Sequence, residues 1–163
     1  MFKFLIVFLV SFSSFSQNNL KDLLKKHNTE TIPYISVDSL QKITSKIIIL
    51  DAREQKEFKV SHLQNALFVG YDNFNINKTT QKLPADKNTK IVVYCSLGIR
   101  SEDISEKLKK AGYTNIYNLY GGIFEWKNKS NIVVDNKNSP TNKIHAFNKE
   151  WSKWLLKGEK IYE

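Results

Sequence analysis

Residues 90–101 of the chain read KIVVYCSLGIRS. An apolar run, Ile91–Tyr94, leads directly into Cys95, a short loop and the start of a helical pattern. The apolar run predicts a strand buried on both faces, and we expect the loop to curl round the cysteine sulfur with inward-pointing N–H groups. A helix N-terminus beside a thiol favours the thiolate, so the segment predicts a reactive cysteine.

Residues 1–16 predict a secretory signal peptide. Met1–Lys3 is a short positive start, Phe4–Val10 is apolar, and Ser11–Ser16 is mostly small and polar. The apolar run is shorter than the roughly 20 residues of a transmembrane helix, so we expect no stable membrane insertion once the signal is removed. We therefore expect an exported protein, periplasmic or secreted, with an uncleaved anchor as the alternative.

Cys95 is the single cysteine in the 163 residues. Cysteines of exported proteins usually pair in disulfides, which one cysteine cannot do within its own chain. Two interpretations remain, a buried inert side chain or a reactive thiol. The loop that follows Cys95 favours the reactive thiol.

Apolar runs alternate with helical patterns along most of the chain. The predicted strands are Tyr34–Val37, Ile47–Leu50, Ala66–Val69, Ile91–Tyr94 and Ile116–Leu119. The predicted helices are Leu20–His27, Asp38–Thr44, Glu54–Val60, Glu102–Ala111 and a short one after Gly122. This order predicts an α/β fold with a five-stranded parallel sheet flanked by helices. Ligands of such sheets bind beyond the carboxyl ends of the strands, where Cys95 lies.

Four segments follow the predicted signal peptide. They are an N-terminal helical segment at 17–33, a main domain at 34–127, a polar linker at 128–142 and a C-terminal helical extension at 143–163. The apolar positions with helical spacing in the extension are Phe147, Trp151, Trp154 and Leu155. They predict an aromatic helix that either docks on the core or binds a protein partner through Trp151 and Trp154.

The chain is basic, with a formal net charge of +9 at pH 7. Its lysines are scattered and form no basic stripe among aromatic residues, so we expect no nucleic-acid binding. The excess positive charge favours a small anionic substrate. No histidine has the spacing of a metal ligand, and we expect neither a metal nor another cofactor.

Several motifs together resemble those of single-domain rhodaneses, the sulfurtransferase family. They are Asp51-Ala52-Arg53-Glu54 with Glu57-Phe58, Ser61–Ala66, the cysteine loop Tyr94–Ser101, and Gly112–Trp126 with its Gly-Gly-Ile-x-x-Trp ending. The resemblance covers Tyr34–Lys127 and implies a rhodanese-like three-layer fold. It departs from the family where relatives often have Gly-His-Ile-Pro-Gly-Ala and this chain has Ser61-His62-Leu63-Gln64-Asn65-Ala66, which puts the geometry of that turn in doubt.

The resemblance implies sulfur transfer through a persulfide on Cys95. The thiolate takes a sulfane sulfur from thiosulfate or a similar small anionic donor, and a thiol or cyanide then removes it. The loop residues that would bind the substrate are Ser96, Leu97, Gly98, Ile99, Arg100 and Ser101. Asp51, Arg53 and Glu57 would support the loop.

The sequence leaves the role of Arg100 open, since it either faces the pocket or ties the loop to the body of the domain. Arg53 is predicted to form a structural ion pair with Glu57, four residues on, with Asp51 nearby. His62 is predicted to be a packed, hydrogen-bonded side chain and not a general base.

Other functions compete with sulfur transfer. A cysteine phosphatase or arsenate reductase would have five residues between cysteine and arginine, whereas four separate Cys95 from Arg100. A non-catalytic rhodanese-like binding module and a persulfide carrier acting with a partner protein are the further alternatives. An internal thiol–disulfide cycle would need a second, resolving cysteine.

Overall fold

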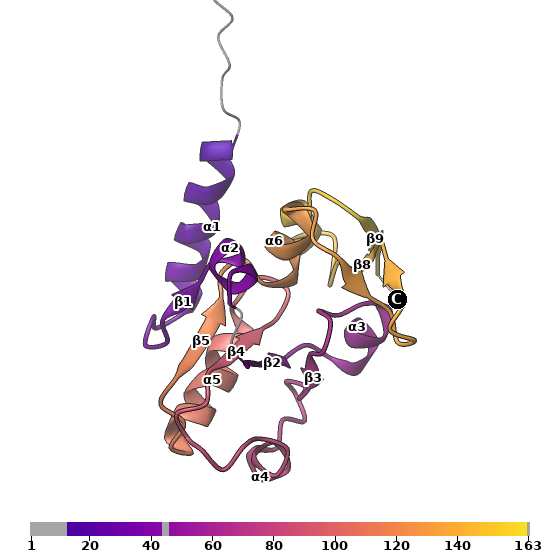
Figure 1. Cartoon of the computed structure of the whole chain (residues 1–163). Helices are drawn as coiled ribbons and strands as arrows, with labels where there is room; N and C mark the ends of the chain where they lie inside the picture. Colours follow the sequence, from indigo (N-terminus) through magenta and orange to yellow (C-terminus); the bar gives the residue numbers. More distant parts are fainter. Residues whose placement is uncertain (1–12, 44–45, 163) are drawn as a thin grey trace, which may run out of the picture.

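The computed structural model describes residues 13–43 and 46–162. Its central sheet has five parallel strands in the order β1-β5-β4-β2-β3 (Figure 1). The strands are β1 Tyr34–Ile35, β2 Ile48–Asp51, β3 Leu67–Phe68, β4 Ile91–Tyr94 and β5 Ile116–Leu119. The predicted five-stranded parallel sheet is therefore confirmed.

Strand β4 lies in the middle of the sheet, and all four of its residues are buried. Val92 and Tyr94 point into one apolar cluster, and Ile91 and Val93 point into the other. Side chains alternate between the faces of a strand, so a continuous apolar run is what a strand covered on both sides requires. Cys95 follows at the carboxyl end of β4.

Helices cover both faces of the sheet and complete three layers (Figure 1). They are α1 Ser13–His27, α2 Val37–Gln41, α3 Gln55–Val60, α4 Ile76–Thr80, α5 Arg100–Lys110 and α6 Gly122–Asn128. Helix α5 buries Ile104 and Leu108 in the cluster of Ile91 and Val93. The opposite cluster takes Leu24 from α1 and residues of α2 and α6. The short helix α4 has no counterpart among the predicted elements.

The C-terminal segment differs from the predicted aromatic helix over residues 143–163. It contains strands β8 Lys143–His145 and β9 Glu159–Ile161, which pair in parallel, and a 3₁₀ helix, η1, at Trp151–Trp154. Phe147 has a φ of 66°, a left-handed value that no α-helix tolerates. An aromatic α-helix is therefore wrong, although Ile144 and Leu155 still reach the core.

Residues 128–142, predicted to be a polar linker, contain a small antiparallel sheet of β6 Val133–Val134 and β7 Pro140–Thr141. Both valines are buried. The backbone of Val134 exchanges two hydrogen bonds with His62, at 2.8 and 2.9 Å. This contact fixes the segment to the body of the domain.

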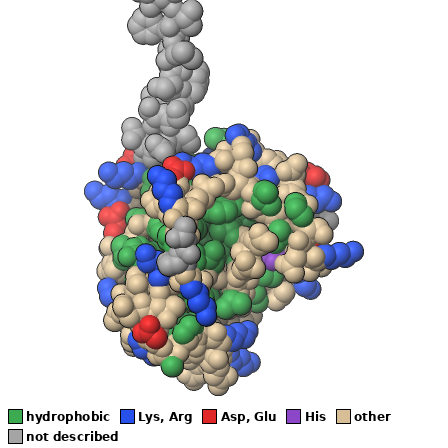
Figure 2. Space-filling view, in the orientation of Figure 1, with side chains coloured by type: hydrophobic (Ala, Val, Ile, Leu, Met, Phe, Trp, Pro, Cys, Tyr) green, Lys and Arg blue, Asp and Glu red, His purple; other side chains and the backbone are tan. Residues whose placement is uncertain are grey.

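Residues 1–12 of the predicted signal peptide lie outside the described residues. Within 13–43 and 46–162, no helix combines the length and the apolar character needed to cross a bilayer. Figure 2 shows lysine and arginine side chains spread over one face of the molecule, with no single basic patch on that face.

Candidate active site

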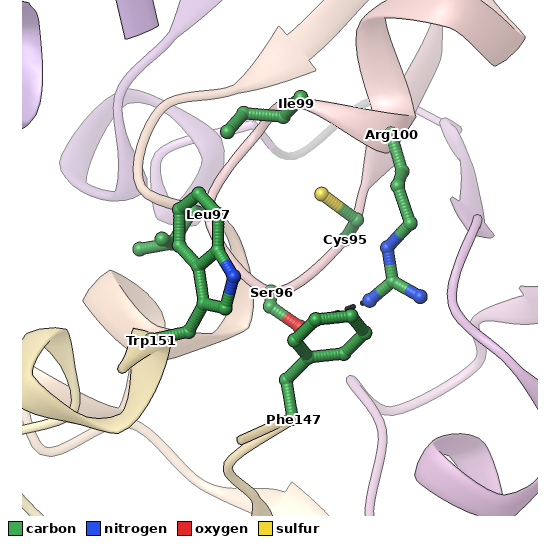
Figure 3. Close-up of a pocket in the computed structure, with 7 residues that line it drawn as sticks. All are labelled: Cys95, Ser96, Leu97, Ile99, Arg100, Phe147 and Trp151. Carbon is green, nitrogen blue, oxygen red and sulfur yellow. Dashed lines mark hydrogen bonds between the residues drawn. The ribbon is translucent and has the colours of Figure 1, made fainter. Parts of the chain in front are cut away.

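Cys95 lies in the loop between β4 and α5, with 2% of its surface exposed. Its sulfur points toward the centre of the loop that follows it (Figure 3). The N–H of Gly98 donates a hydrogen bond to Sγ at 3.1 Å. The loop therefore curls round the sulfur, as the sequence predicts.

Helix α5 begins at the same place. Its first N–H groups have no partner within the helix, and its N-terminus favours negative charge. The hydroxyl of Ser101 in the first turn lies 3.5 Å from Sγ. A negatively charged sulfur at Cys95 is thus adjacent to backbone and hydroxyl donors.

The cysteine loop is held from behind by two asparagines that the sequence analysis missed. Asn28 and Asn118 both donate side-chain N–H bonds to the carbonyl of Gly98, at 2.8 and 2.7 Å. Asn118 also accepts the Ser101 hydroxyl at 2.7 Å. Gly98 has a φ of 115°, which a residue with a Cβ resists. The signal for Asn118 was its amide within an otherwise apolar buried strand, β5.

Helix α6 approaches the loop so closely that only glycine fits at its first residue. Gly122 has a φ of 54°, and a Cβ there would lie 2.3 Å from the carbonyl oxygen of Cys95. That oxygen accepts the N–H of Ile123 at 2.9 Å, and the carbonyl of Ser96 accepts the N–H of Phe124 at 3.2 Å. The Gly-Gly turn therefore fixes the backbone on both sides of the sulfur.

Arg100 forms a two-pronged ion pair with Glu57 of α3, at 2.7 and 2.8 Å. It also donates to the hydroxyl of Ser96 at 3.1 Å. Figure 3 shows its guanidinium directed toward Ser96 and Phe147. Arg100 thus braces the loop and lines the pocket, so both interpretations of this residue apply.

The ion pair controls the ionisation of its carboxylate. Burial by itself would raise the pKa of Glu57, but the hydrogen bonds and charge of Arg100 outweigh it and lower the pKa from 4.5 to about 2. Burial likewise acts to lower the pKa of Arg100, while Glu57 and the neighbouring Cys95 raise it above its usual value. The Glu57 carboxylate is therefore ionised at neutral pH and in mild acid.

The predicted pairing of Arg53 with Glu57 is wrong. Arg53 is fully buried and binds Asp51 at 2.7 Å and the carbonyl of Ser61 at 2.6 Å. Helix α3 begins only at Gln55, so Arg53 and Glu57 do not share a helical face. Asp51 and Arg53 support the domain beneath the loop, and Glu57 is free to reach Arg100.

His62 is a packed side chain. Its ring stacks on Phe58 with the ring centres 3.8 Å apart, and its Nδ1 lies 3.0 Å from the Phe58 carbonyl oxygen. In the turn that departs from the family pattern, Asn65 has a φ of 62°. Asparagine tolerates this conformation, so the turn forms without the glycine of relatives.

A pocket of about 100 Å³ opens over the cysteine loop. Its lining residues are Cys95, Ser96, Leu97, Ile99, Arg100, Phe147 and Trp151 (Figure 3). Five of the predicted loop residues thus meet at the pocket, while Gly98 and Ser101 contact the sulfur from within the loop. Phe147 and Trp151 were predicted as part of an aromatic helix, with Trp151 as a possible contact for a protein partner, and their place in the pocket was missed.

Comparison with known sequences places the site in a family context. A family model of the Rhodanese-like domain matches residues 36–129. The tRNA uridine(34) hydroxylases of Erwinia tasmaniensis and Aster yellows witches'-broom phytoplasma are each 36% identical to the chain, over 85 and 107 residues. These matches cover 51% and 64% of this chain but only 24% and 34% of the hydroxylases. The chain thus spans about a quarter to a third of their length.

Solved structures show the same fold. A rhodanese-related protein from Thermoplasma volcanium is 26% identical, with a TM-score of 0.54 over 63% of this chain and 97% of that one. A thiosulfate sulfurtransferase from Pseudomonas aeruginosa is 17% identical, with a TM-score of 0.60 over 86% of this chain and 26% of that one. The family match spans more than half of the sequence and includes the cysteine loop, and the chain belongs to the rhodanese-like domain family.

Proposed function

We propose that the protein is a sulfurtransferase that carries a sulfane sulfur as a persulfide on Cys95. The supporting observation is the placement of Sγ within the loop, 3.1 Å from the Gly98 N–H and at the floor of a pocket. Such a loop can hold the charge of an outer sulfur with backbone donors. Family membership supports the same chemistry.

In the first step, the Cys95 thiolate attacks the outer sulfur of thiosulfate or a similar donor. The bond between that sulfur and the sulfonate group breaks, its electron pair leaves with sulfite, and Cys95 becomes a persulfide anion. In the second step, an external thiolate or cyanide attacks the outer sulfur and releases the Cys95 thiolate. The chain has one cysteine, so the acceptor must come from outside it.

Intact-mass spectrometry after incubation with thiosulfate tests this proposal. We expect the wild-type protein to gain one sulfur atom and to lose it again on addition of cyanide. Cys95→Ser should gain none while unfolding at the same urea concentration as the wild type. A wild-type protein that gains no sulfur would favour the non-catalytic binding module instead.

We also propose that the protein is exported, periplasmic or secreted. The support is the positive start followed by the apolar run Phe4–Val10. Mass analysis of the protein recovered outside the cytoplasm should find a chain that begins after Ser16. A recovered chain that still begins at Met1 would indicate an uncleaved anchor.

A further inference from the structure

The outer wall of the pocket comes from the C-terminal segment. Phe147 and Trp151 both line it, and both lie beyond residues 36–129, the part that matches the family. Figure 3 shows both side chains extending from the C-terminal segment toward the residues of the cysteine loop. Leu97 and Ile99 complete the apolar lining from the loop itself.

Phe147 is held in place at a conformational cost. It is the central residue of a three-residue turn closed by the N–H of Asn148 and the carbonyl of Ala146 at 2.9 Å, and its φ is 66°. Its own N–H donates to Nδ1 of the buried His145 at 3.1 Å. Strained left-handed residues other than glycine cluster where a side chain must be aimed at a site. The turn aims this ring at the pocket.

Independent contacts hold the two rings. The guanidinium of Arg100 lies 5.0 Å from the centre of the Phe147 ring. Trp151 starts the 3₁₀ helix with its N–H bonded to the Asn148 side chain at 2.8 Å, and its ring meets His27 of α1 edge-on at 6.2 Å. These contacts fix the positions of the Phe147 and Trp151 rings. We call the two rings together the aromatic wall of the pocket.

Apart from the sulfur of Cys95, the described lining of the pocket has no uncompensated charge. Arg100 is the one charged side chain among its seven described lining residues, and both of its prongs are taken by Glu57. Thiosulfate can reach the donors of the cysteine loop at the floor of the pocket, but an anionic group held against Phe147 and Trp151 would lose hydration without gaining a free cation as partner. A neutral apolar group would instead gain contact with Phe147 and Trp151.

We propose that this pocket binds the uncharged, apolar body of a small organic thiol, and that Phe147 and Trp151 set this preference for the sulfur acceptor. The inference rests on the proposed function, because the acceptor must react with a persulfide on Cys95. The thiol first loses its proton to solvent, and its sulfur then attacks the outer sulfur of the persulfide. A new S–S bond forms, the bond to Sγ breaks, and its electron pair returns to the Cys95 thiolate. No oxidant or reductant is needed.

The test measures the second half-reaction alone. The protein is loaded to completion with thiosulfate, freed of donor, and its mass checked for the added sulfur. Discharge is then timed by mass spectrometry with phenylmethanethiol, which is apolar and uncharged, and with 3-sulfanylpropanoate, which carries a carboxylate. The rate with cyanide normalises for the reactivity of the persulfide, and the ratio of the two thiol rates is compared between variants, so that intrinsic thiol reactivity cancels.

Phe147→Gly and Trp151→Ala should each lower the ratio of the phenylmethanethiol rate to the 3-sulfanylpropanoate rate by about two- to tenfold. Phe147→Gly keeps the turn, because glycine adopts a positive φ freely. Trp151→Phe should restore most of the preference. Leu156→Ala is the matched control, since Leu156 lies in the same segment, is 67% exposed and does not line the pocket.

Urea unfolding shows whether each variant is folded, and the intact mass after incubation with thiosulfate shows whether it still acquires the sulfur. A variant that passes both checks but has a changed rate ratio has changed in acceptor specificity. A ratio unchanged in both Phe147→Gly and Trp151→Ala would overturn the inference while leaving the proposed function intact. A wild-type protein discharged faster by the anionic thiol than by phenylmethanethiol, relative to free persulfide in solution, would overturn it as well. A protein that acquires no sulfur at all would overturn the proposed function and this inference with it.

Discussion

Replacing Glu57 by glutamine removes the charge that compensates Arg100. Glu57 is 1% exposed and Arg100 is 15% exposed by side chain, so little water can replace the lost partner. Removing one member of a buried pair leaves an uncompensated charge and typically costs about 3–5 kcal/mol of unfolding free energy. The variant also loses a carboxylate that accepts the N–H of Glu54 at 2.9 Å, at the start of α3.

The pKa of Glu57 gives an independent magnitude. A fall from 4.5 to about 2 on folding corresponds to about 3 kcal/mol of stability. Because the pKa is lowered in the folded state, this stability is fully present above pH 4.5 and is lost as the pH falls through about 2. At pH 3 the same pKa values leave about 1 kcal/mol, less than half of the value at pH 7.

The assay is urea unfolding followed by the fluorescence of the three tryptophans, at pH 7 and pH 3. We expect Glu57→Gln to be about 3 kcal/mol less stable than the wild type at pH 7, with the difference roughly halved at pH 3. Glu159→Gln, at an exposed carboxylate of β9, is the control and should change stability little. A difference below about 1 kcal/mol at pH 7, or one that does not shrink in acid, would refute the reasoning.

Two further substitutions test the backbone of the loop and the base of the aromatic wall. Gly122→Ala should prevent persulfide loading and cost more stability than Gly112→Ala, because both glycines have positive φ but only the Cβ at Gly122 would collide with the Cys95 carbonyl. The urea midpoint measures the loss of stability, and the intact mass measures the persulfide loading. Equal losses in Gly122→Ala and Gly112→Ala would count against the close approach of Gly122 to the Cys95 carbonyl. Burial lowers the pKa of His145 below its usual 6.5, so the unfolded state binds a proton there more readily than the folded state as the pH falls below 6.5, and the free energy of unfolding should decline. His145→Asn, which keeps an acceptor for the Phe147 N–H without titrating, should lack this part of the decline in urea unfolding between pH 7 and pH 5.

The sheet could be predicted from the sequence because its inner strands β2 and β4 carry apolar residues toward both faces. Ile91–Tyr94 and Ile47–Leu50 are apolar without interruption, and this pattern identifies strands in the middle of a parallel sheet. The polar and loop-forming residues on either side of each apolar run place the ends of the predicted strands to within a few residues. The position of Cys95 at a strand end followed from the same pattern.

The C-terminal segment could not be predicted in this way. Phe147, Trp151 and Leu155 are four residues apart, which is the spacing of a helical stripe. The segment instead forms a strand, because Lys143–His145 pairs with Glu159–Ile161 across a long stretch of chain. Periodicity reports local neighbours only, so it carries no information on this pairing or on the turn at Phe147.

The ion pairs of the site show the same limit. The four-residue spacing predicted an ion pair between Arg53 and Glu57. However, α3 starts after Arg53, and its first turn directs Glu57 toward the cysteine loop. The partner of Glu57 is Arg100, 43 residues away. Charge pairs inside a fold are decided by the approach of separate elements, which spacing along the chain does not reveal.

Arg100 contacts both the cysteine loop and the Phe147 ring. Whether Glu57 compensates its charge decides whether the pocket favours an anionic or an apolar thiol. An arginine at a pocket mouth would by itself attract anions, and the charge of +9 would reinforce that. The low pKa of Glu57 keeps its carboxylate ionised at neutral pH, so the guanidinium stays neutralised whenever the site is assembled. The same guanidinium then stacks on Phe147 and presents an apolar ring to the pocket. Phe147 and Trp151 should therefore set the preference for the acceptor thiol. Glu57→Gln leaves the charge of Arg100 uncompensated, and it should shift the ratio of the acceptor rates toward the anionic thiol.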